Sequence, residues 1–179
     1  MEINLIVAMD NNRCIGKNGK LPFAQKSDMV RFKMLTMGNI VIMGRKTFDS
    51  LGQKPLPGRM NYVISSDASK LSQVYFSNQN VQFFRTVNAC IQHLNSLIYD
   101  GLCDEVISNI FVIGGESIYR EFLPLASRIY ATYIETEIEG GDTFFPEIPE
   151  DFIEEDLDGV HPMDGKNEYN YYFVDYVRK

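Results

Sequence analysis

The first residue whose type and position suggest chemistry is Asp28. Ser27, just before it, can cap a helix, and we predict a helix over residues 27–37. Three- and four-residue spacing then puts Asp28 on one stripe with Phe32 and Leu35, on the inward face. A carboxylate there could complement the helix dipole, or it could be buried and need a ligand with N–H donors. This stretch alone does not choose between the two.

Two glycine turns could bind phosphate. In NIVIMGRKTF a buried strand runs into Gly44 and directly into a helix, and in NIFVIGGESIY another runs into Gly114 and Gly115 before a helix. The free N–H groups and positive dipole end of a helix start attract phosphate, and glycine lets it approach closely. Neither turn matches G-x-G-x-x-G or the Walker pattern, so neither indicates a standard Rossmann or P-loop site. Each could also be only a tight turn.

Basic residues gather around these turns in the first third of the chain. Arg45 and Lys46 open the helix after the first turn, and Ser65 and Ser66 end the next strand. Because the carboxyl ends of parallel strands bind ligands in open α/β sheets, this grouping favours a ligand with several phosphates, such as a dinucleotide. Arg59 follows a Pro-Gly turn and could grip a carboxylate with two parallel bonds, although an exposed Arg after a turn is common.

Composition limits the remaining possibilities. With 179 residues and 45% hydrophobic content, we expect a single domain over residues 1–179. A net charge of −7 disfavours binding to nucleic acid or to acidic membranes, and no apolar run is long enough to cross a bilayer. The three cysteines form no C-x-x-C pair and there are only two histidines, which argues against a metal site and for reduced thiols in the cytoplasm.

The apolar pattern predicts an alternation of strands and helices, hence a largely parallel sheet covered on both faces. The buried strands are predicted at 3–9, 39–43, 61–65, 81–84 and 109–114. The helices are predicted at 27–37, 47–51, 87–99 and 116–123. The tail differs, because residues 128–138 and 168–179 alternate apolar with polar, as half-exposed strands do. We expect residues 66–80 and 139–167 to be loops.

In their order and spacing, six segments resemble the dihydrofolate reductase family. They are LIVAMDNNRCIGKNGKLPF at 5–23, SDMVRFKMLT at 27–36, VIMGRKTFDSL at 41–51, LPGRMNYVISS at 56–66, VIGGESIYREFLP at 112–124 and IYATYIETEIEGGDTFFP at 129–146. The resemblance implies a single-domain α/β fold. Its central sheet would be mostly parallel, with about eight strands, flanking helices and an antiparallel C-terminal edge strand.

The same resemblance implies an oxidoreductase that uses NADPH to reduce 7,8-dihydrofolate to 5,6,7,8-tetrahydrofolate for one-carbon metabolism and thymidylate synthesis. Hydride would pass from the nicotinamide to the pterin, with protonation of a ring nitrogen. The enzyme would be a cytoplasmic monomer that also binds antifolate inhibitors. The implied catalytic residues are Asp28, Thr132 and Leu21. Asp28 would pair with the amino-pyrimidine edge of the pterin, assisted by Thr132; whether it donates the proton directly or through water stays open.

Further residues follow from the resemblance by position. Those around the folate would be Ile6, Ala8, Met29, Phe32, Leu56, Arg59 and Ile113, with Arg59 on the glutamate carboxylate. Those around NADPH would be Val7, Ala8, Ile15, Gly16, Gly44, Arg45, Lys46, Thr47, Ser65, Ser66, Gly114, Gly115, Ser117 and Tyr119. Arg45 and Ser66 would lie near the 2′-phosphate, and the Gly114–Gly115 bond would be cis. Residues 16–23 resemble a mobile loop with Asp142 as its partner.

The chain also departs from the family pattern. Phe23 stands where Trp is frequent, Ser117 stands where an Arg often contacts the adenosine phosphate, the GGD sequence has an extra glycine, and the 67–110 region is long. Two rival functions remain: a pyrimidine reductase of riboflavin synthesis, and a non-catalytic module that keeps cofactor affinity. Asp28 on its helix and Arg59 argue against the first. Intact Asp28, Thr132 and both glycine turns argue against the second.

Overall fold

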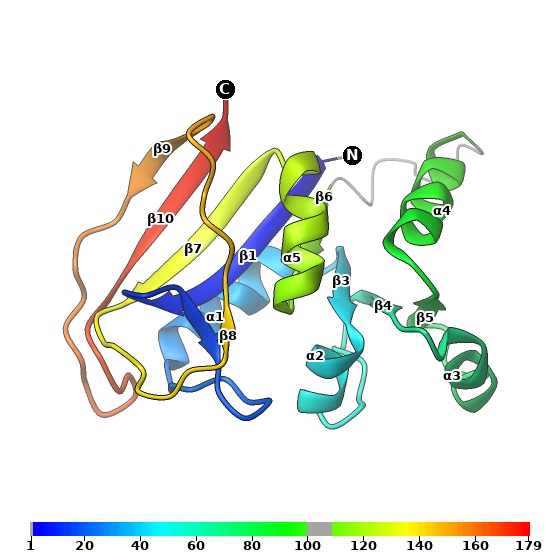
Figure 1. Ribbon diagram of the computed structural model, residues 1–179, viewed down its shortest axis with the longest axis horizontal. Coiled ribbons are helices and arrows are strands. Elements are labelled where there is room, and N and C mark those ends of the chain that lie inside the picture. The colour runs from blue at the N-terminus through cyan, green and yellow to red at the C-terminus, as the bar shows by residue number, and fades with distance from the viewer. Residues whose placement is uncertain (1, 100–108) are drawn as a thin grey trace.

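The structure is a computed structural model that describes residues 2–99 and 109–179. Its centre is an eight-stranded sheet in the order β5-β4-β3-β6-β1-β7-β10-β9 (Figure 1). These strands are β1 (Glu2–Asp10), β3 (Ile40–Gly44), β4 (Met60–Ile64), β5 (Val81–Phe84), β6 (Asn109–Val112), β7 (Arg128–Ile134), β9 (Phe152–Leu157) and β10 (Tyr171–Arg178). The pairings from β5 through β7 are parallel, whereas β10 runs antiparallel to both neighbours. The predicted mostly parallel α/β sheet is confirmed.

Helices cover both faces of this sheet, as the alternating pattern predicts. They are α1 (Lys26–Thr36), α2 (Arg45–Ser50), α3 (Ala68–Val74), α4 (Val87–Tyr99) and α5 (Glu116–Phe122), which a 3-10 turn extends over Leu123–Leu125. Along β1, alternate side chains enter two different cores, because a strand points successive residues to opposite faces. Ile6 joins the core under α1 and α2, while Leu5, Val7 and Met9 join the core under α4 and α5.

Some predicted boundaries and loops were wrong. Helix α3 lies in the first predicted loop, with only Ala68 and Leu71 buried, so it shows little apolar periodicity. In the second, β9 has only Phe152 buried, and β8 (Thr143–Phe144) pairs with β2 (Cys14–Gly16). Since β9 lies outside β10, the C-terminal strand is antiparallel but is not the edge. Residues 100–108 of the long 67–110 region lie outside the described residues.

The start of α1 is held differently from the prediction. Its N-cap residue is Gln25, which makes no side-chain cap bond, so Ser27 is not the cap. Instead, the Ser27 backbone N–H donates to the Asn167 side-chain oxygen at 2.9 Å, and the Asn167 amide donates to the Ser27 hydroxyl at 3.1 Å. The Gln25 side chain donates to the Tyr169 carbonyl at 2.9 Å. A segment about 140 residues away in the sequence therefore positions the helix that carries Asp28.

Two cysteines, Cys14 and Cys90, are buried and unpaired, and Cys103 lies outside the described residues. In the described ranges, no helix combines the length and the apolar character needed to cross a membrane.

Candidate active site

Asp28 lies in the first turn of α1, and its carboxyl group faces Thr132 on β7. Thr132 is buried, and its hydroxyl donates a hydrogen bond to the Asp28 carboxylate. Burial raises the pKa of the Asp28 carboxyl above its usual range, although the Thr132 bond and the positive charge of Arg31 act in the opposite direction. The acid on the helix stripe is therefore a desolvated group in need of a donor, and not only a complement to the helix dipole.

Apolar side chains surround this carboxyl group. Ala8 pairs in register with Thr132 and Ile6 with Tyr130, so both lie on the same sheet face as Thr132. Phe32, Leu56 and Ile113 pack against the core that contains Ile6. The structure thus brings these predicted substrate residues together. Met29, another predicted substrate residue, is 55% exposed, and Leu21, a predicted catalytic residue, is 50% exposed, so both lie at the surface.

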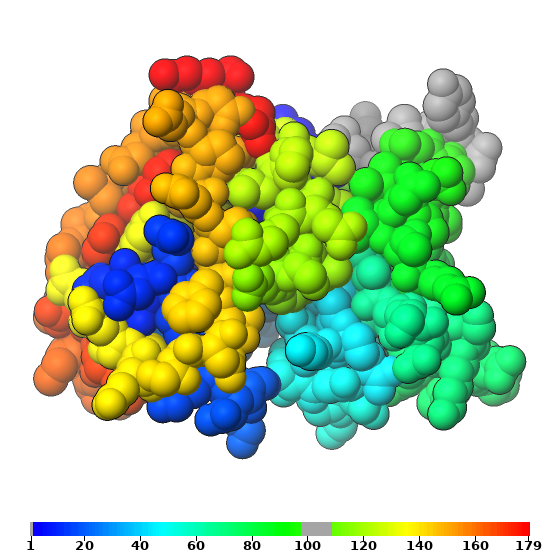
Figure 2. All heavy atoms as spheres, in the orientation of Figure 1, coloured from blue at the N-terminus to red at the C-terminus, as the bar shows by residue number. Residues whose placement is uncertain are grey.

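The space-filling view shows where this region opens. The surface is hollowed between the blue segment that follows β2 and the cyan α2 (Figure 2). The first segment carries the predicted mobile loop and the second carries Arg45 and Lys46. The predicted mobile loop and the helix that carries Arg45 and Lys46 therefore border the same depression.

Arg59 is held rigidly, contrary to the common case of an exposed Arg after a turn. It is 7% exposed, and burial lowers the pKa of its guanidinium. Its Nε donates to the Pro57 carbonyl at 3.0 Å, and its Nη1 donates to the Thr36 hydroxyl at 3.1 Å. Thr36 in turn donates to the Phe32 carbonyl at 2.7 Å, which ties the guanidinium to α1. Thr36 was not among the predicted site residues, since one threonine in a helix gives no sequence signal.

The two glycine turns touch each other. The Gly44 N–H donates to the Gly114 carbonyl at 2.7 Å, and the predicted cis Gly114–Gly115 bond is confirmed. A Cβ at Gly114 would lie 3.0 Å from the Tyr119 ring, at a φ of 111° that side chains rarely adopt. A Cβ at Gly44 would lie 3.0 Å from Ile118. The starts of α2 and α5 therefore meet closely only because glycine occupies both turns, and neither helix has a side-chain cap.

The other predicted cofactor residues divide into exposed and buried groups. Arg45 donates through Nε to Asp49 at 2.8 Å at the surface, and Lys46, Ser66 and Ser117 are exposed. Thr47 lies beside Gly115, and Ser65 follows β4, where its hydroxyl accepts from the Asp67 N–H at 3.2 Å. By contrast, Val7 is buried in the core against which Ile15 packs. Tyr119 is fully buried and donates to the Ile6 carbonyl at 2.7 Å, so its hydroxyl joins α5 to β1.

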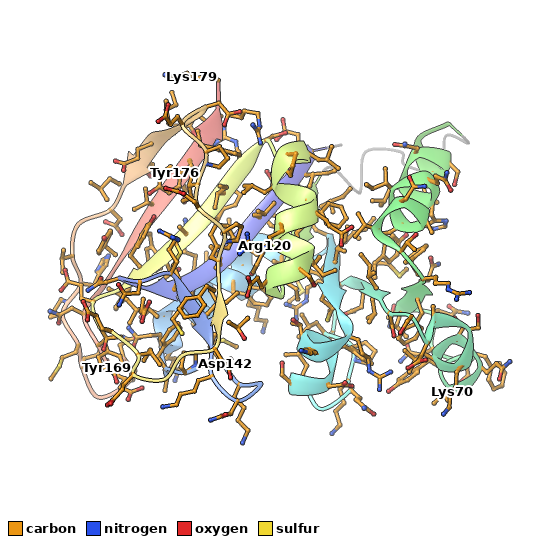
Figure 3. All side chains as sticks on the ribbon, in the orientation of Figure 1. Lys70, Arg120, Asp142, Tyr169, Tyr176 and Lys179 are labelled. Carbon is orange, nitrogen blue, oxygen red and sulfur yellow. The ribbon has the colours of Figure 1, made fainter. Side chains whose placement is uncertain are left out.

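The predicted partner of the mobile loop is in contact with it. The Asn18 N–H donates to the Asp142 carboxylate at 2.7 Å, and the Asp142 N–H donates to the Gly16 carbonyl at 3.1 Å. Figure 3 shows Asp142 beside the blue loop that follows β2. Hydrogen bonds from Asn18 and Thr143 hold the pKa of the Asp142 carboxyl below its usual value. The loop is therefore tied down at its base.

A second carboxylate, missed from the sequence, joins the same two segments. Asp10 is fully buried and accepts backbone N–H bonds from Asn12 at 2.8 Å, Cys14 at 2.7 Å and Ile138 at 2.7 Å. Close by, a Cβ at Gly141 would lie 2.4 Å from the Cys14 sulfur. The extra glycine of the GGD sequence is thus explained by the cysteine packed against it.

Phe23, at the position where the family often has Trp, is 6% exposed and packs with Ile134 and Tyr171. It therefore anchors the end of the loop in a small core of its own.

Comparisons with known proteins agree with this arrangement. A sequence model described as dihydrofolate reductase matches residues 2–178. A type 3 dihydrofolate reductase of Salmonella typhimurium is 36% identical over 179 residues, covering 100% of this chain and 99% of the relative. The Bacillus subtilis dihydrofolate reductase is 37% identical, with 99% and 95% covered. A solved dihydrofolate reductase of Enterococcus faecalis, complexed with NADP(H) and RAB-propyl, has a TM-score of 0.80 at 30% identity, covering 99% of this chain and 96% of its own.

Proposed function

This chain belongs to the dihydrofolate reductase family, and we propose that its Asp28 carboxylate binds and orients the pterin ring of dihydrofolate. The activity is the NADPH-dependent reduction of dihydrofolate to tetrahydrofolate. When bound, NADPH supplies the hydride for this reduction. The protein must therefore bind both molecules, align them, exclude water and manage one proton.

The observation that carries this proposal is the desolvated carboxyl group of Asp28 beside Thr132. A carboxylate that has lost water needs hydrogen-bond donors, and a 2-amino-4-oxo pyrimidine edge offers two N–H groups to its two oxygens. The Thr132 hydroxyl fixes the orientation of the carboxylate. Ile6, Ala8 and Phe32 supply apolar contact for the flat ring.

The same carboxyl group handles the proton. Among the described residues of this apolar region, Asp28 is the acid that faces the pterin position, and burial holds its pKa above the usual range. We infer that Asp28 polarises and directs a water molecule toward the pterin ring nitrogen, which accepts the proton. Leu21, on the loop tied to Asp142, would limit the access of other water.

The residues at the two turns suit a phosphorylated dinucleotide. A Cβ at Gly44 or Gly114 would fall 3.0 Å from the Ile118 or Tyr119 side chain, so glycine leaves the backbone of these turns open to close approach. Lys46 and Arg45 provide positive charge beside the first turn, in a chain whose net charge is −7. Thr47, Ser65, Ser66 and Ser117 would add hydroxyl donors around the phosphates. Ile15 and Gly16 would border the nicotinamide.

The Arg59 side chain would bind the α-carboxylate of the folate glutamate tail. Two of its nitrogens are already oriented by Pro57 and Thr36, so little conformational entropy is lost on binding. Leu56 and Met29 would contact the part of the folate between pterin and carboxylate.

The test is NADPH oxidation by the purified chain with dihydrofolate, with and without methotrexate. We expect turnover that methotrexate suppresses, and loss of turnover in Asp28→Asn. No turnover with dihydrofolate, or turnover insensitive to both changes, would reject the proposal.

We also infer that the enzyme works as a cytoplasmic monomer on small molecules. The buried unpaired thiols of Cys14 and Cys90 and the net charge of −7 support this inference. Light scattering on the purified protein tests it; a mass twice that of the chain would contradict the monomer.

A further inference from the structure

One half-buried cation lies beside Asp28. Arg31 follows it by three positions on α1, and its side chain is only 18% exposed. The guanidinium forms an ion pair with Asp175 on β10 and lies 4.5 Å above the Phe173 ring centre and 5.7 Å from that of Tyr130. Arginine is rarely withdrawn from water unless it is paired, and here Asp175 supplies the opposite charge.

The sheet register puts this cation next to the partner of Asp28. Phe173 pairs with Thr132, and Asp175 pairs with Tyr130. Residues three apart on a helix are neighbours on its surface. Thr132 and Phe173 therefore lie side by side on β7 and β10. The Asp28 carboxylate faces Thr132, and the Arg31 guanidinium lies over the neighbouring Phe173 ring.

Asp175 does not use the whole guanidinium. The recorded pairing joins one nitrogen, Nη2, to one carboxylate oxygen. The Nη1 atom is buried and, within residues 2–99 and 109–179, has no hydrogen-bond partner. A bidentate pair would neutralise the cation more evenly. The guanidinium charge also acts on Asp28, three residues earlier on α1, in a region where water screens it poorly.

We propose that Arg31, held in place by Asp175, is a positioning residue that keeps the Asp28 carboxylate ionised so that it can hold the pterin at neutral pH. The inference rests on the role proposed above for Asp28. Arg31 makes no contact with the substrate in this scheme. It acts through the charge that it places beside the carboxylate.

Asp28 and Arg31 each face several polar or charged groups on neighbouring elements. Asp28 faces the Thr132 hydroxyl on β7, Arg31 on its own helix, and Tyr119 from α5, which burial keeps neutral by raising its pKa. The Arg31 charge lowers the pKa of the Asp28 carboxyl, whereas burial raises it.

Arg31 itself faces Asp175 on β10, Tyr130 on β7 and, at longer range, Asp158 after β9. Asp158 is bonded to His161 at 2.8 Å, and its exposure weakens its effect through solvent screening. The ion pair with Asp175 is therefore the main competitor for the charge of Arg31.

Removal of Arg31 and removal of Asp175 should shift the pKa of the Asp28 carboxyl in opposite directions. Arg31→Met leaves Asp175 as an unbalanced anion, so both the lost cation and the remaining anion favour protonated Asp28. Asp175→Asn leaves the cation unopposed and favours ionised Asp28. The double variant Arg31→Met/Asp175→Leu removes both charges, so its shift should be smaller than that of Arg31→Met.

The experiment measures the pH profile of kcat/KM for dihydrofolate together with the ¹³C carboxylate titration of Asp28, assigned with Asp28→Asn. We expect the midpoint of Arg31→Met to rise by roughly one pH unit, the lower end of the effect of an adjacent opposite charge. The midpoint of Asp175→Asn should fall, and Arg31→Lys should restore a midpoint near that of the parent. Arg128→Met, which breaks the exposed Arg128–Glu155 pair on the same sheet, is the matched control and should leave it unchanged.

If the ion pair were purely structural, its loss would lower the stability of every variant without shifting the pH midpoints in opposite directions. That result would overturn the inference. If Arg31→Met does not fold, the lower pH midpoint expected for Asp175→Asn tests the inference by itself, and an unchanged midpoint would overturn it. Failure of the proposed function is distinguishable, because Asp28→Asn would then retain turnover whatever the behaviour of Arg31.

Discussion

Charged groups are held in two different ways in the two halves of the site. Between α1 and β7, Asp28 and Arg59 are withdrawn from water, and each has a hydroxyl partner on a neighbouring element, Thr132 or Thr36. At the starts of α2 and α5, the charged side chains are exposed, and the Arg45–Asp49 pair keeps 32% and 41% of its side-chain surface in solvent. An interaction in low dielectric is strong and specific, whereas an exposed one is screened. Single substitutions should therefore matter more in the substrate half.

The largest effect should come from Asp28→Asn. Removal of the carboxylate that we propose directs the proton should lower turnover at neutral pH by roughly 10²- to 10⁴-fold, the usual contribution of a general acid or base. Steady-state kinetics measure it, and an unchanged circular dichroism spectrum would show that the fold persists. Turnover within a factor of two of the parent would remove the role assigned to Asp28.

Next in size is Arg59→Ala. Loss of a charge-assisted pair with a carboxylate costs about 1.5–3 kcal/mol, which corresponds to a roughly 10- to 150-fold weaker dissociation constant for dihydrofolate. NADPH affinity should change little, because the carboxylate that we propose Arg59 binds belongs to the folate. Thr36→Val keeps the guanidinium but frees its Nη1, so it should give the same pattern with a smaller loss. Equal losses of affinity for dihydrofolate and for NADPH would contradict the contrast between the two halves of the site.

The buried carboxylate should also cost stability. Because burial raises the folded-state pKa of Asp28, the unfolded chain ionises this group more readily than the folded protein does. The folded state is therefore favoured by this group only at low pH, and that advantage is lost as pH rises through the folded pKa. Asp28→Asn should unfold at a higher temperature than the parent at pH 7. The gain should shrink as pH falls from the folded pKa to the unfolded pKa, which thermal scans across pH can follow.

The smallest effect should come from Asp49→Asn in the cofactor half. An exposed i,i+4 ion pair is worth about 0.3–0.5 kcal/mol, so KM for NADPH should change by roughly twofold and the change should fade at high salt. A tenfold change in KM for NADPH that persists at high salt would show that solvent does not screen the Arg45–Asp49 pair. The contrast between the two halves of the site would then be weaker than we infer.

The sequence was most informative where a local pattern matched a single structural cause. The strand-to-helix turns at Gly44 and Gly114 can be recognised from the sequence because only glycine suits them. Asp28 can be recognised because it is an acid in an apolar stripe. The missed elements lack such signals. Helix α3 buries only two residues, and β9 shows a run of charges because its edge position leaves them in water.

Residue types and spacing by themselves determined the alternation of strands and helices and the candidate carboxylate, since these depend on neighbours within a few positions along the chain. Tertiary structure alone decided what lies beside those residues: Thr36 under Arg59, Asn167 at the start of α1, Asp10 joining two loops and Asp175 paired with Arg31. These contacts join residues 23 to 144 positions apart. Their energies depend on burial and relative orientation, which only the packed molecule defines.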